Sequence, residues 1–448
     1  MSAPPRDEKR VQLGLFCGLL LIFLAVWKGD GGYVDLMQYL DNTESLWLKG
    51  ELSIPGRPGQ YYIHPLGISV LSGPFVVAGA AVEKLSGGAV GRRSIAALSI
   101  PVFAALACVL LYRIGRELRL SPLVSLWGAL MLALGSPVLN YTRFYFAEAG
   151  IALSVCTAGW AFLRARRAEG RAAVGWTLLA GAGLAGATAC HFNNVFVSGF
   201  LWLGMTAAIL TDRSKPRAAL VAALTVIPVL AGGLLLYLNA RRFGTPFSTG
   251  YEPLLQAESV HAMSFRNLPI NIGFLGRWLL RVPWVIPAFA VLVLSRPREK
   301  YWAAGLALAV VAHLLFLQTF AGMHVFPIRY QQTPVIVLSV GLLLLGAGLW
   351  RRWRERGLFY SGLLLLLWNA AHYIRFDYGV QTIWISQVDQ RVNCYLWYMS
   401  PSKQTYYGSP MGVLQWAVLA ALLASGCAAL ALTARSARRL DDPAPPSA

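Results

Sequence analysis

The chain has 448 residues, of which 56% are hydrophobic and only 13% are charged. A soluble domain carries about 25% charged residues, so this composition excludes an ordinary soluble enzyme and predicts a protein surrounded by lipid. The net charge of +19 would suggest a nucleic-acid partner in a soluble protein. In a membrane protein, basic residues flank the spans and set their orientation, so we expect no nucleic-acid partner.

The sequence lacks the common motifs of nucleotide and zinc enzymes, having no Walker sequence, no HExxH and no paired CxxC. ATP-driven transport and zinc hydrolysis therefore have no support. The six cysteines are scattered along the chain, mostly in apolar runs. Their spacing predicts neither a disulfide framework nor a metal site.

Apolar runs of about 20 residues recur along the whole chain, and each is long enough to cross about 30 Å of hydrocarbon. They lie at 11–28, 63–83, 93–112, 121–139, 147–163, 174–190, 192–210, 218–238, 277–295, 301–320, 331–350, 357–373 and 411–433. The first run follows Arg6, Lys9 and Arg10, and no small-residue cleavage site comes after it. We therefore interpret it as an uncleaved first span rather than a signal peptide.

Basic clusters alternate with longer acidic and aromatic loops between these runs. The clusters are Arg113/Arg116/Arg119, Arg164/Arg166/Arg167/Arg171, Arg213/Lys215/Arg217, Arg296/Arg298/Lys300, Arg351/Arg352/Arg354/Arg356 and Arg435/Arg438/Arg439. The positive-inside rule puts all of them in the cytoplasm, together with the basic N-terminal tail.

This arrangement requires that one early apolar run does not cross the membrane. Segment 63–83 is the natural candidate, because its prolines and glycines interrupt helical hydrogen bonding. These residues are Pro65, Gly67, Gly73, Pro74 and Gly79. We interpret the segment as a re-entrant or interfacial helix. A rival topology, in which the N-terminus lies outside and 63–83 crosses, stays open.

The sequence thus predicts an all-α polytopic membrane protein with about 12 transmembrane helices, plus interfacial or re-entrant helices in the first outer loop. Residues 1–448 form a single transmembrane domain. Its main outer loops are 29–92, 239–276 and 374–410, and its cytoplasmic tail is 434–448. Because the outer loops carry most of the acidic residues, we expect the chemistry on the outer face.

The first outer loop carries the strongest candidate for a general base. Asp30 lies at the mouth of the first span, and two glycines follow it. A carboxylate that is partly desolvated at the bilayer edge suits proton abstraction from an acceptor hydroxyl or amine. Asp35 is a second catalytic candidate. We interpret Asp41, Glu44 and Glu51 as ordinary solvated acids of an interfacial helix.

The second outer loop, NYTRFYFAEAG, offers a further acid. Glu148 begins a span and Arg143 precedes it. Because an acid at the end of a span is costly unless it is paired or solvated, two readings are open. Either the two side chains form a local ion pair, or Glu148 faces Asp30 across a cavity and orients the acceptor or a metal ion. We favour the second reading.

Several polar side chains at the outer ends of the apolar runs are candidates for substrate binding. Arginine offers a phosphate a permanent charge and a planar fork of donors, and loop 239–276 combines arginines with aromatic residues that suit a lipid headgroup and a sugar. The candidates are Tyr62, His64, Arg143, His191, Asn193, Tyr251, Arg329 and Tyr330. For each histidine, a hydrogen-bonded interface residue is the plainer alternative.

Four groups of motifs follow one another over most of the chain. They are GDGGY with SLWLKGEL, GQYYIHPLGISVLSGPF, TRFYFAEAGIAL, and FGTPFSTGY with PIRYQQTPVIVL. In this order they resemble motifs of the C-type (GT-C) membrane glycosyltransferases, in particular the bacterial relatives of protein O-mannosyltransferases and of lipid A aminoarabinose transferase. The resemblance puts Asp30 at the catalytic Asp and Glu148 at the second-loop acid, where Asp is commoner. It puts His64 in the position of a lysine.

The resemblance implies a hexosyl- or pentosyl-transferase of the bacterial inner (plasma) membrane, with its active site facing the periplasm or exterior. It would move a sugar, with inversion, from a polyprenyl phosphate to a glycan, lipid or protein acceptor, and Asp30 would be the general base. No cofactor is required, and a divalent cation held by Asp30 and Glu148 stays open. The alternative is a multi-span lipid or solute transporter or flippase, which predicts internal repeats and charges in the middle of spans. A polymerase or ligase for a lipid-linked glycan is a third reading.

Overall fold

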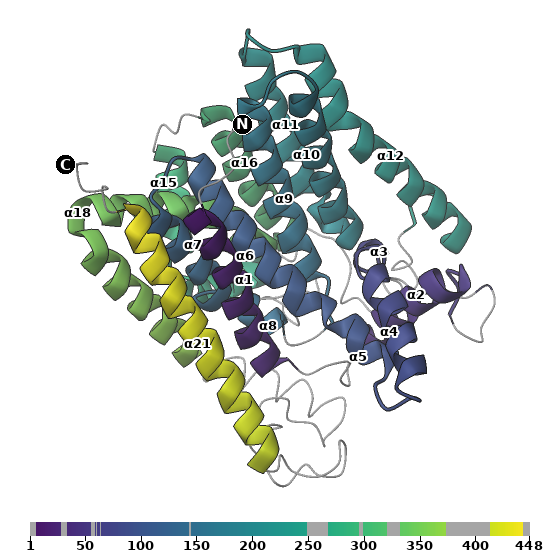
Figure 1. Cartoon of the computed structure of the whole chain (residues 1–448). Helices are drawn as coiled ribbons and strands as arrows, with labels where there is room; N and C mark the ends of the chain where they lie inside the picture. Colours follow the sequence, from purple (N-terminus) through teal and green to yellow (C-terminus); the bar gives the residue numbers. More distant parts are fainter. Residues whose placement is uncertain are drawn as a thin grey trace.

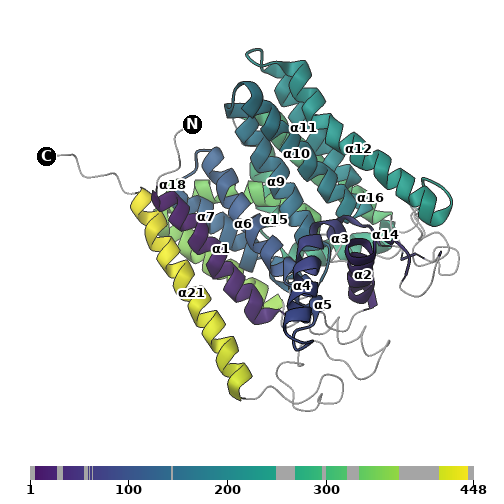
Figure 2. The same ribbon diagram turned by 45° about the vertical axis from the view of Figure 1, so that its right-hand side comes forward.

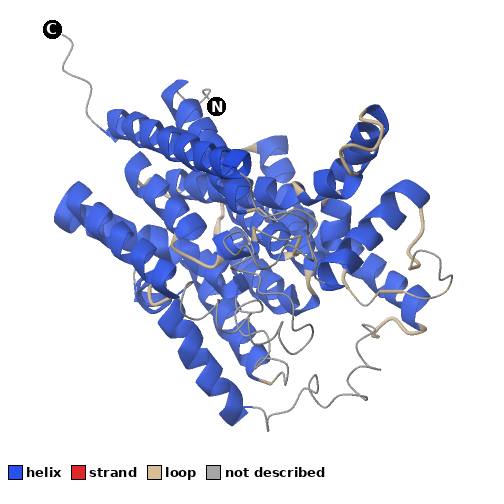
Figure 3. Ribbon diagram, turned by 90° about the horizontal axis from the view of Figure 1, so that it is seen from below, coloured by secondary structure: helices blue, strands red, loops and turns tan. Residues whose placement is uncertain are grey.

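The structure is a computed structural model that describes residues 6–27, 34–54, 59, 61, 62, 64–142, 145–248, 268–294, 299–319, 332–372 and 413–441. All regular elements within these ranges are helices (Figure 3). The predicted all-α class is therefore confirmed.

Long helices form a bundle, and the short helices between residues 34 and 97 lie at its lower right in Figure 1. The long helices are α1 (Arg6–Val26), α6 (Ser99–Glu117), α9 (Glu148–Arg167), α10 (Gly170–Cys190), α11 (Val195–Thr211), α12 (Arg217–Phe243), α16 (Lys300–Gln318), α18 (Gln332–His372) and α21 (Val413–Asp441). The shorter helices are α2 (Val34–Glu44), α3 (Gly67–Leu71), α4 (Gly73–Leu85), α5 (Arg92–Ala97), α7 (Pro122–Leu134), α8 (Val138–Tyr141), α14 (Leu268–Arg281) and α15 (Val285–Leu294). A π-helical turn, η1 (Ser45–Lys49), extends α2, and a 3₁₀ turn, η2 (Phe192–Asn194), joins α10 to α11.

The length and composition of the described helices show that this is a multi-pass membrane protein. Eight are long and apolar enough to cross a bilayer, or nine if α14 and α15, which are bent by 90° relative to each other, form one broken span. The predicted count of about 12 is not shown. Helix α7 has only 13 residues, and α9 carries three arginines in its last turn. Helix α18 contains two apolar runs on either side of Arg354, whose backbone is non-helical with φ of 54° and ψ of −140°.

Ion pairs bring the predicted basic clusters together at one end of the bundle. Arg116 pairs with Glu8 at the start of α1 over 3.3 Å, and Arg164 on α9 pairs with Glu117 at the end of α6 over 3.2 Å. At the same end of the bundle, Arg438 of α21 pairs with Glu355, in the bend of α18, over 2.7 Å. We call this end the basic end. The residues named lie at one end of the bundle, and the cytoplasmic side of the clusters stays a prediction.

A second set of contacts joins α9 to the ends of two more helices, α11 and α16, at the basic end. Arg166 of α9 pairs with Asp212 over 2.7 Å and with Glu299 over 3.3 Å. A hydrogen bond from the hydroxyl of Ser214, 2.6 Å away, holds the pKa of the Asp212 carboxyl below its usual value, with a smaller contribution from Arg166. Asp212 is therefore an ionised partner for the arginine at neutral pH.

Segment 63–83, which we expected not to cross the membrane, forms two short helices at the opposite end of the bundle. Helix α3 has 5 residues and α4 has 13, which at 1.5 Å per residue is too short for a bilayer core of about 30 Å. Figures 1 and 2 both show α2, α3, α4 and α5 beyond the lower end of α9 and level with the lower half of α1. We call this the site end.

Close helix crossings inside the bundle depend on glycine. A Cβ atom at Gly204 of α11 would lie 2.8 Å from the Cα of Gly305 and 2.8 Å from the carbonyl oxygen of Tyr301, both on α16. Small residues let helix backbones approach in this way, so that van der Waals contact stabilises association in lipid. Gly199, on the same helix, has open space around it.

The crossing predicts different effects for two glycines on one helix. Gly204→Leu should separate α11 from α16 and destabilise the protein by about 1–3 kcal/mol, the usual cost of overpacking. Gly199→Leu should be close to neutral, because it adds a side chain facing lipid. Thermal unfolding of the purified variants in detergent measures both, and equal loss of stability would contradict this packing.

Candidate active site

The site end is built by the docking of α3 onto the ends of two long helices. A Cβ atom at Gly67 would lie 2.3 Å from backbone atoms of both Ala189 and Cys190 at the C-terminal end of α10. A Cβ at Gly150, in the first turn of α9, would lie 3.0 Å from the side chain of Ile68. Glycine is therefore needed for α3, α9 and α10 to meet so closely.

His64 lies just before α3 and is 4% exposed. Its ring stacks on the ring of Tyr39 in α2, with centroids 4.3 Å apart and an angle of 27° between the planes. The stack fixes the orientation of the imidazole and joins α2 to the segment 61–66. We call 61–66 the His64 segment.

A buried arginine holds the His64 segment from the other side. Arg242 stands at the C-terminal end of α12, which stops at Gly244 with φ of 84°, and it is 8% exposed. Its Nη2 atom donates hydrogen bonds to the carbonyl oxygens of Tyr62 and of His64, the latter at 3.3 Å. A permanent cation is thereby held beside the residue that the resemblance puts in the position of a lysine.

Glu148 begins α9 at the same end and is 4% exposed. The positive end of the α9 dipole favours a carboxylate in this first turn. The turn before it is fixed by a hydrogen bond of 3.0 Å between the hydroxyls of Tyr145 and Thr43 on α2. Burial raises the pKa of Tyr145 to about 12, so that the hydroxyl is neutral.

His191 and Asn193 follow directly after the end of α10, next to the docking point of α3. Both side chains are half-buried. The neighbouring Asn194 is buried, and its amide donates to the carbonyl oxygen of Ala187 at 3.1 Å, which closes the end of the helix. Of the predicted site residues, the structure therefore brings Tyr62, His64, Glu148, His191 and Asn193 to one end of the bundle.

Other predicted site residues cannot be assessed in the same way. Asp35 lies in the first turn of α2, but its side chain is outside what the structure describes. The remaining candidates fall outside the described residues altogether: Asp30, Arg143, Tyr251, Arg329 and Tyr330. Within the described part of the chain, no three His, Cys, Asp or Glu side chains group as metal ligands would.

The interpretation of Asp41 and Glu44 as solvated acids is wrong. Glu44 is 8% exposed, and Arg93 of α5 contacts both acids, at 2.9 Å from Glu44 and 2.5 Å from Asp41. A signal was present in the sequence, since the Arg92–Arg93 pair lies between an outer-loop segment and a span, where the positive-inside rule does not expect it. Basic residues there need acidic partners.

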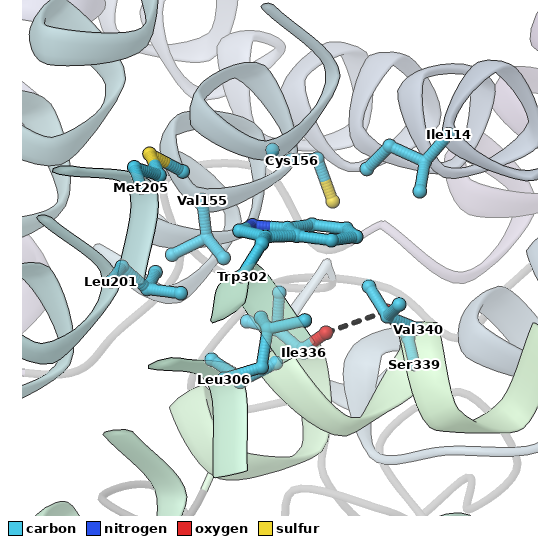
Figure 4. Close-up of a pocket in the computed structure, with 12 residues that line it drawn as sticks. Ile114, Val155, Cys156, Leu201, Met205, Trp302, Leu306, Ile336, Ser339 and Val340 are labelled. Atoms are coloured by element: carbon cyan, nitrogen blue, oxygen red, sulfur yellow. Dashed lines mark hydrogen bonds between the residues drawn. The ribbon is translucent and has the colours of Figure 1, made fainter. Parts of the chain in front are cut away.

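A small cavity in the middle of the bundle is a poor candidate for a substrate site (Figure 4). Its lining is mostly apolar and includes Trp302, Cys156 and Leu306, while the hydroxyl of Ser339 donates to the carbonyl oxygen of Ile336 at 2.5 Å. The space open to a water-sized sphere is about 10 Å³, which is room for roughly one water molecule. A sugar or a lipid headgroup does not fit there.

Comparison with solved structures finds a similar fold in ArnT from Cupriavidus metallidurans bound to undecaprenyl phosphate. The TM-score is 0.57 at 17% sequence identity, over 96% of this chain and 74% of that one. The chain has the GT-C fold of membrane glycosyltransferases. The apo state of the same ArnT gives a TM-score of 0.56 at 15% identity, over the same shares of the two chains.

The GT-C fold that the motifs predicted is therefore confirmed. A weaker likeness, with a TM-score of 0.48 at 10% identity, is to the archaeal oligosaccharyltransferase AglB from Archaeoglobus fulgidus in complex with an inhibitory peptide and a dolichol-phosphate; it covers 99% of this chain and 57% of that one. No protein-family profile and no curated protein sequence matches the chain.

The docking of α3 predicts that a single methyl group opens the site end. Gly67→Ala should push α3 away from α10 and let a maleimide reach the buried thiol of Cys190 at least tenfold faster, measured by mass spectrometry of the labelled peptide. Gly91→Ala is the matched control, because Gly91 has open space around it. Equal labelling rates in Gly67→Ala and the wild type would contradict the close contact.

Proposed function

We propose that this protein is a membrane glycosyltransferase that moves a sugar from a polyprenyl phosphate to an acceptor hydroxyl or amine. The observation that carries the proposal is the GT-C fold together with the gathering of a buried acid, an imidazole and a buried arginine at its site end. The ArnT structure with the same fold was solved with undecaprenyl phosphate, which supports a lipid-phosphate donor.

The proposed reaction is a single inverting displacement at the anomeric carbon. The acceptor gives its proton to the carboxylate of Asp30, and its oxygen or nitrogen forms a bond to that carbon. The bond from the carbon to the phosphate oxygen breaks, and polyprenyl phosphate leaves with the electron pair. Glu148 orients the acceptor. No cofactor is required, and Asp30 with Glu148 would hold a divalent cation if one takes part.

Arg242 is the cation we propose to stabilise the leaving phosphate. Charge develops on the phosphate oxygens as the bond to the sugar breaks, and a fixed donor in a partly desolvated site stabilises that charge more than water does. The guanidinium lies within hydrogen-bond distance of the backbone of His64. It therefore supplies a permanent charge beside His64.

We further propose that the protein lies in a bacterial inner membrane with the basic end in the cytoplasm and the site end facing the periplasm. The positive-inside rule supports this orientation. A donor with its tail in the bilayer and its sugar at the outer surface would reach the site end directly.

If Asp30 is the general base, its replacement should abolish sugar transfer and leave the protein folded. Asp30→Asn should lower sugar transfer by at least ~100-fold, in line with the usual contribution of a positioned base, while thermal stability stays unchanged. The assay supplies labelled polyprenyl-phosphate sugars and identifies the product by mass analysis. Glu51→Gln, an exposed acid in the same loop, is the control. Full activity of Asp30→Asn would refute the assignment, and donor movement across vesicles without any product would favour a transporter.

We expect substitutions of the two adjacent arginines at the end of α12 to have different effects on transfer. Arg242→Gln removes a buried charge and should lower transfer about 10- to 100-fold, whereas Arg241→Gln changes an exposed side chain and should be near neutral. Arg242→Lys should recover part of the rate, because it keeps the charge but loses the fork of donors. The rate of donor turnover measures all three. Equal effects of the Arg241 and Arg242 variants would contradict the proposed role.

A further inference from the structure

Two acids on one face of α2 bind the arginine pair that begins α5. Arg93 contacts both oxygens of Glu44, at 3.2 and 2.9 Å, and Oδ1 of Asp41 at 2.5 Å. Arg92 contacts Glu44 at 3.1 Å and Glu83 at 3.5 Å. The side chains of Asp41 and Glu44 are only 17% and 11% exposed, so these charges are paired in a partly desolvated environment where losing a partner is costly.

Asp41 is shared between this cluster and the His64 segment. Its second oxygen, Oδ2, accepts a hydrogen bond of 2.7 Å from the hydroxyl of Tyr62. Arg93, Asp41 and Tyr62 therefore form a continuous chain of charge-assisted hydrogen bonds from α5 to the His64 segment. Within the same segment, the backbone carbonyls of Tyr62 and His64 accept from Arg242.

The His64 segment is thus held from two directions by side chains of distant elements. On one side the Tyr62 ring is fixed at its hydroxyl by an acid of α2. On the other side its backbone is fixed by an arginine at the end of α12. Tyr62 and His64 precede α3, which begins at Gly67, and such external contacts help residues outside a helix to keep one conformation.

We propose that Arg93 and Asp41 are positioning residues that fix the His64 segment through the hydroxyl of Tyr62. We call these three residues the Asp41 brace. The brace sets the place of His64 before the donor binds, and with it the geometry in which Arg242 meets the phosphate. This role rests on the proposed function where it concerns the donor. The contacts of the brace lie within the protein and need no substrate. The brace and the proposed function can therefore be tested separately.

The brace also gives the Tyr62 hydroxyl a role other than contact with the sugar. A hydroxyl that binds substrate would affect binding and leave the free protein unchanged. A hydroxyl that belongs to the brace affects the order of the His64 segment in the free protein. Hydrogen exchange without substrate separates the two roles.

The first experiment is hydrogen–deuterium exchange of the full-length protein in lipid nanodiscs, without donor. Tyr62→Phe, which removes one oxygen atom, and Asp41→Asn should each speed exchange of the backbone amides in 64–72 at least about tenfold. The double variant should exchange no faster than the faster single variant, because both changes break the same contact. Arg92→Gln is the matched control: it removes contacts to Glu44 and Glu83 but none to Asp41, and exchange in 64–72 should stay within about twofold of the wild type.

Unchanged exchange in Tyr62→Phe would overturn the brace, whatever the effect of that variant on activity. Additive acceleration in the double variant would overturn it as well. If Asp41→Asn fails to fold, Tyr62→Phe alone decides, since it leaves the ion pair with Arg93 in place.

A second measurement connects the brace to the reaction. Tyr62→Phe should raise KM for the polyprenyl-phosphate sugar about tenfold and change kcat by less than about threefold, because the segment is still able to reach its working position once the donor is bound. A fall in kcat with unchanged KM would overturn the positioning role. If exchange accelerates as expected but the wild-type protein transfers no sugar from any donor, the brace stands and the proposed function fails.

Discussion

The close contact between α3 and the end of α10 is the constraint on which the site end depends. Because Gly67 lies against the backbone of Ala189 and Cys190, the His64 segment lies between α2 and the end of α12. The contacts of His64 with Tyr39, of Arg242 with His64 and of Asp41 with Tyr62 depend on that docking. A bulkier residue at this position would leave each of these groups present but no longer in contact.

The two ends of the bundle use charge in different ways. At the basic end, arginines pair with acids across helix ends, as Arg166 does with Asp212 and Glu299, and these contacts hold the helices in register. At the site end, one buried arginine, Arg242, binds neutral carbonyl oxygens.

The sequence predicted the class, the shared side of the basic clusters and the short helices of 63–83, because these depend on composition and on local breaks such as Pro74. Its motifs also proposed His64 and Glu148 as site residues, and the structure brings both to the site end. The sequence did not predict the pairing of Asp41 with Arg93, or the contact of Arg242 with the His64 segment, since both join residues far apart in the chain. The expected number of spans was not shown, because apolar length alone did not reveal how short α7 is. The break of α18 at Arg354 does fall between the predicted runs 331–350 and 357–373.

The central claim is that a lipid phosphate binds at the site end, between the His64 segment and Arg242. The most direct test is photo-crosslinking of a diazirine-bearing polyprenyl phosphate to the full-length protein in nanodiscs, with the adducts mapped by mass spectrometry. We expect adducts on the peptides that contain His64 and Arg242, and their loss when unlabelled polyprenyl phosphate is added in excess. Adducts confined to peptides of the basic end, such as those with Arg166 or Arg438, would contradict it.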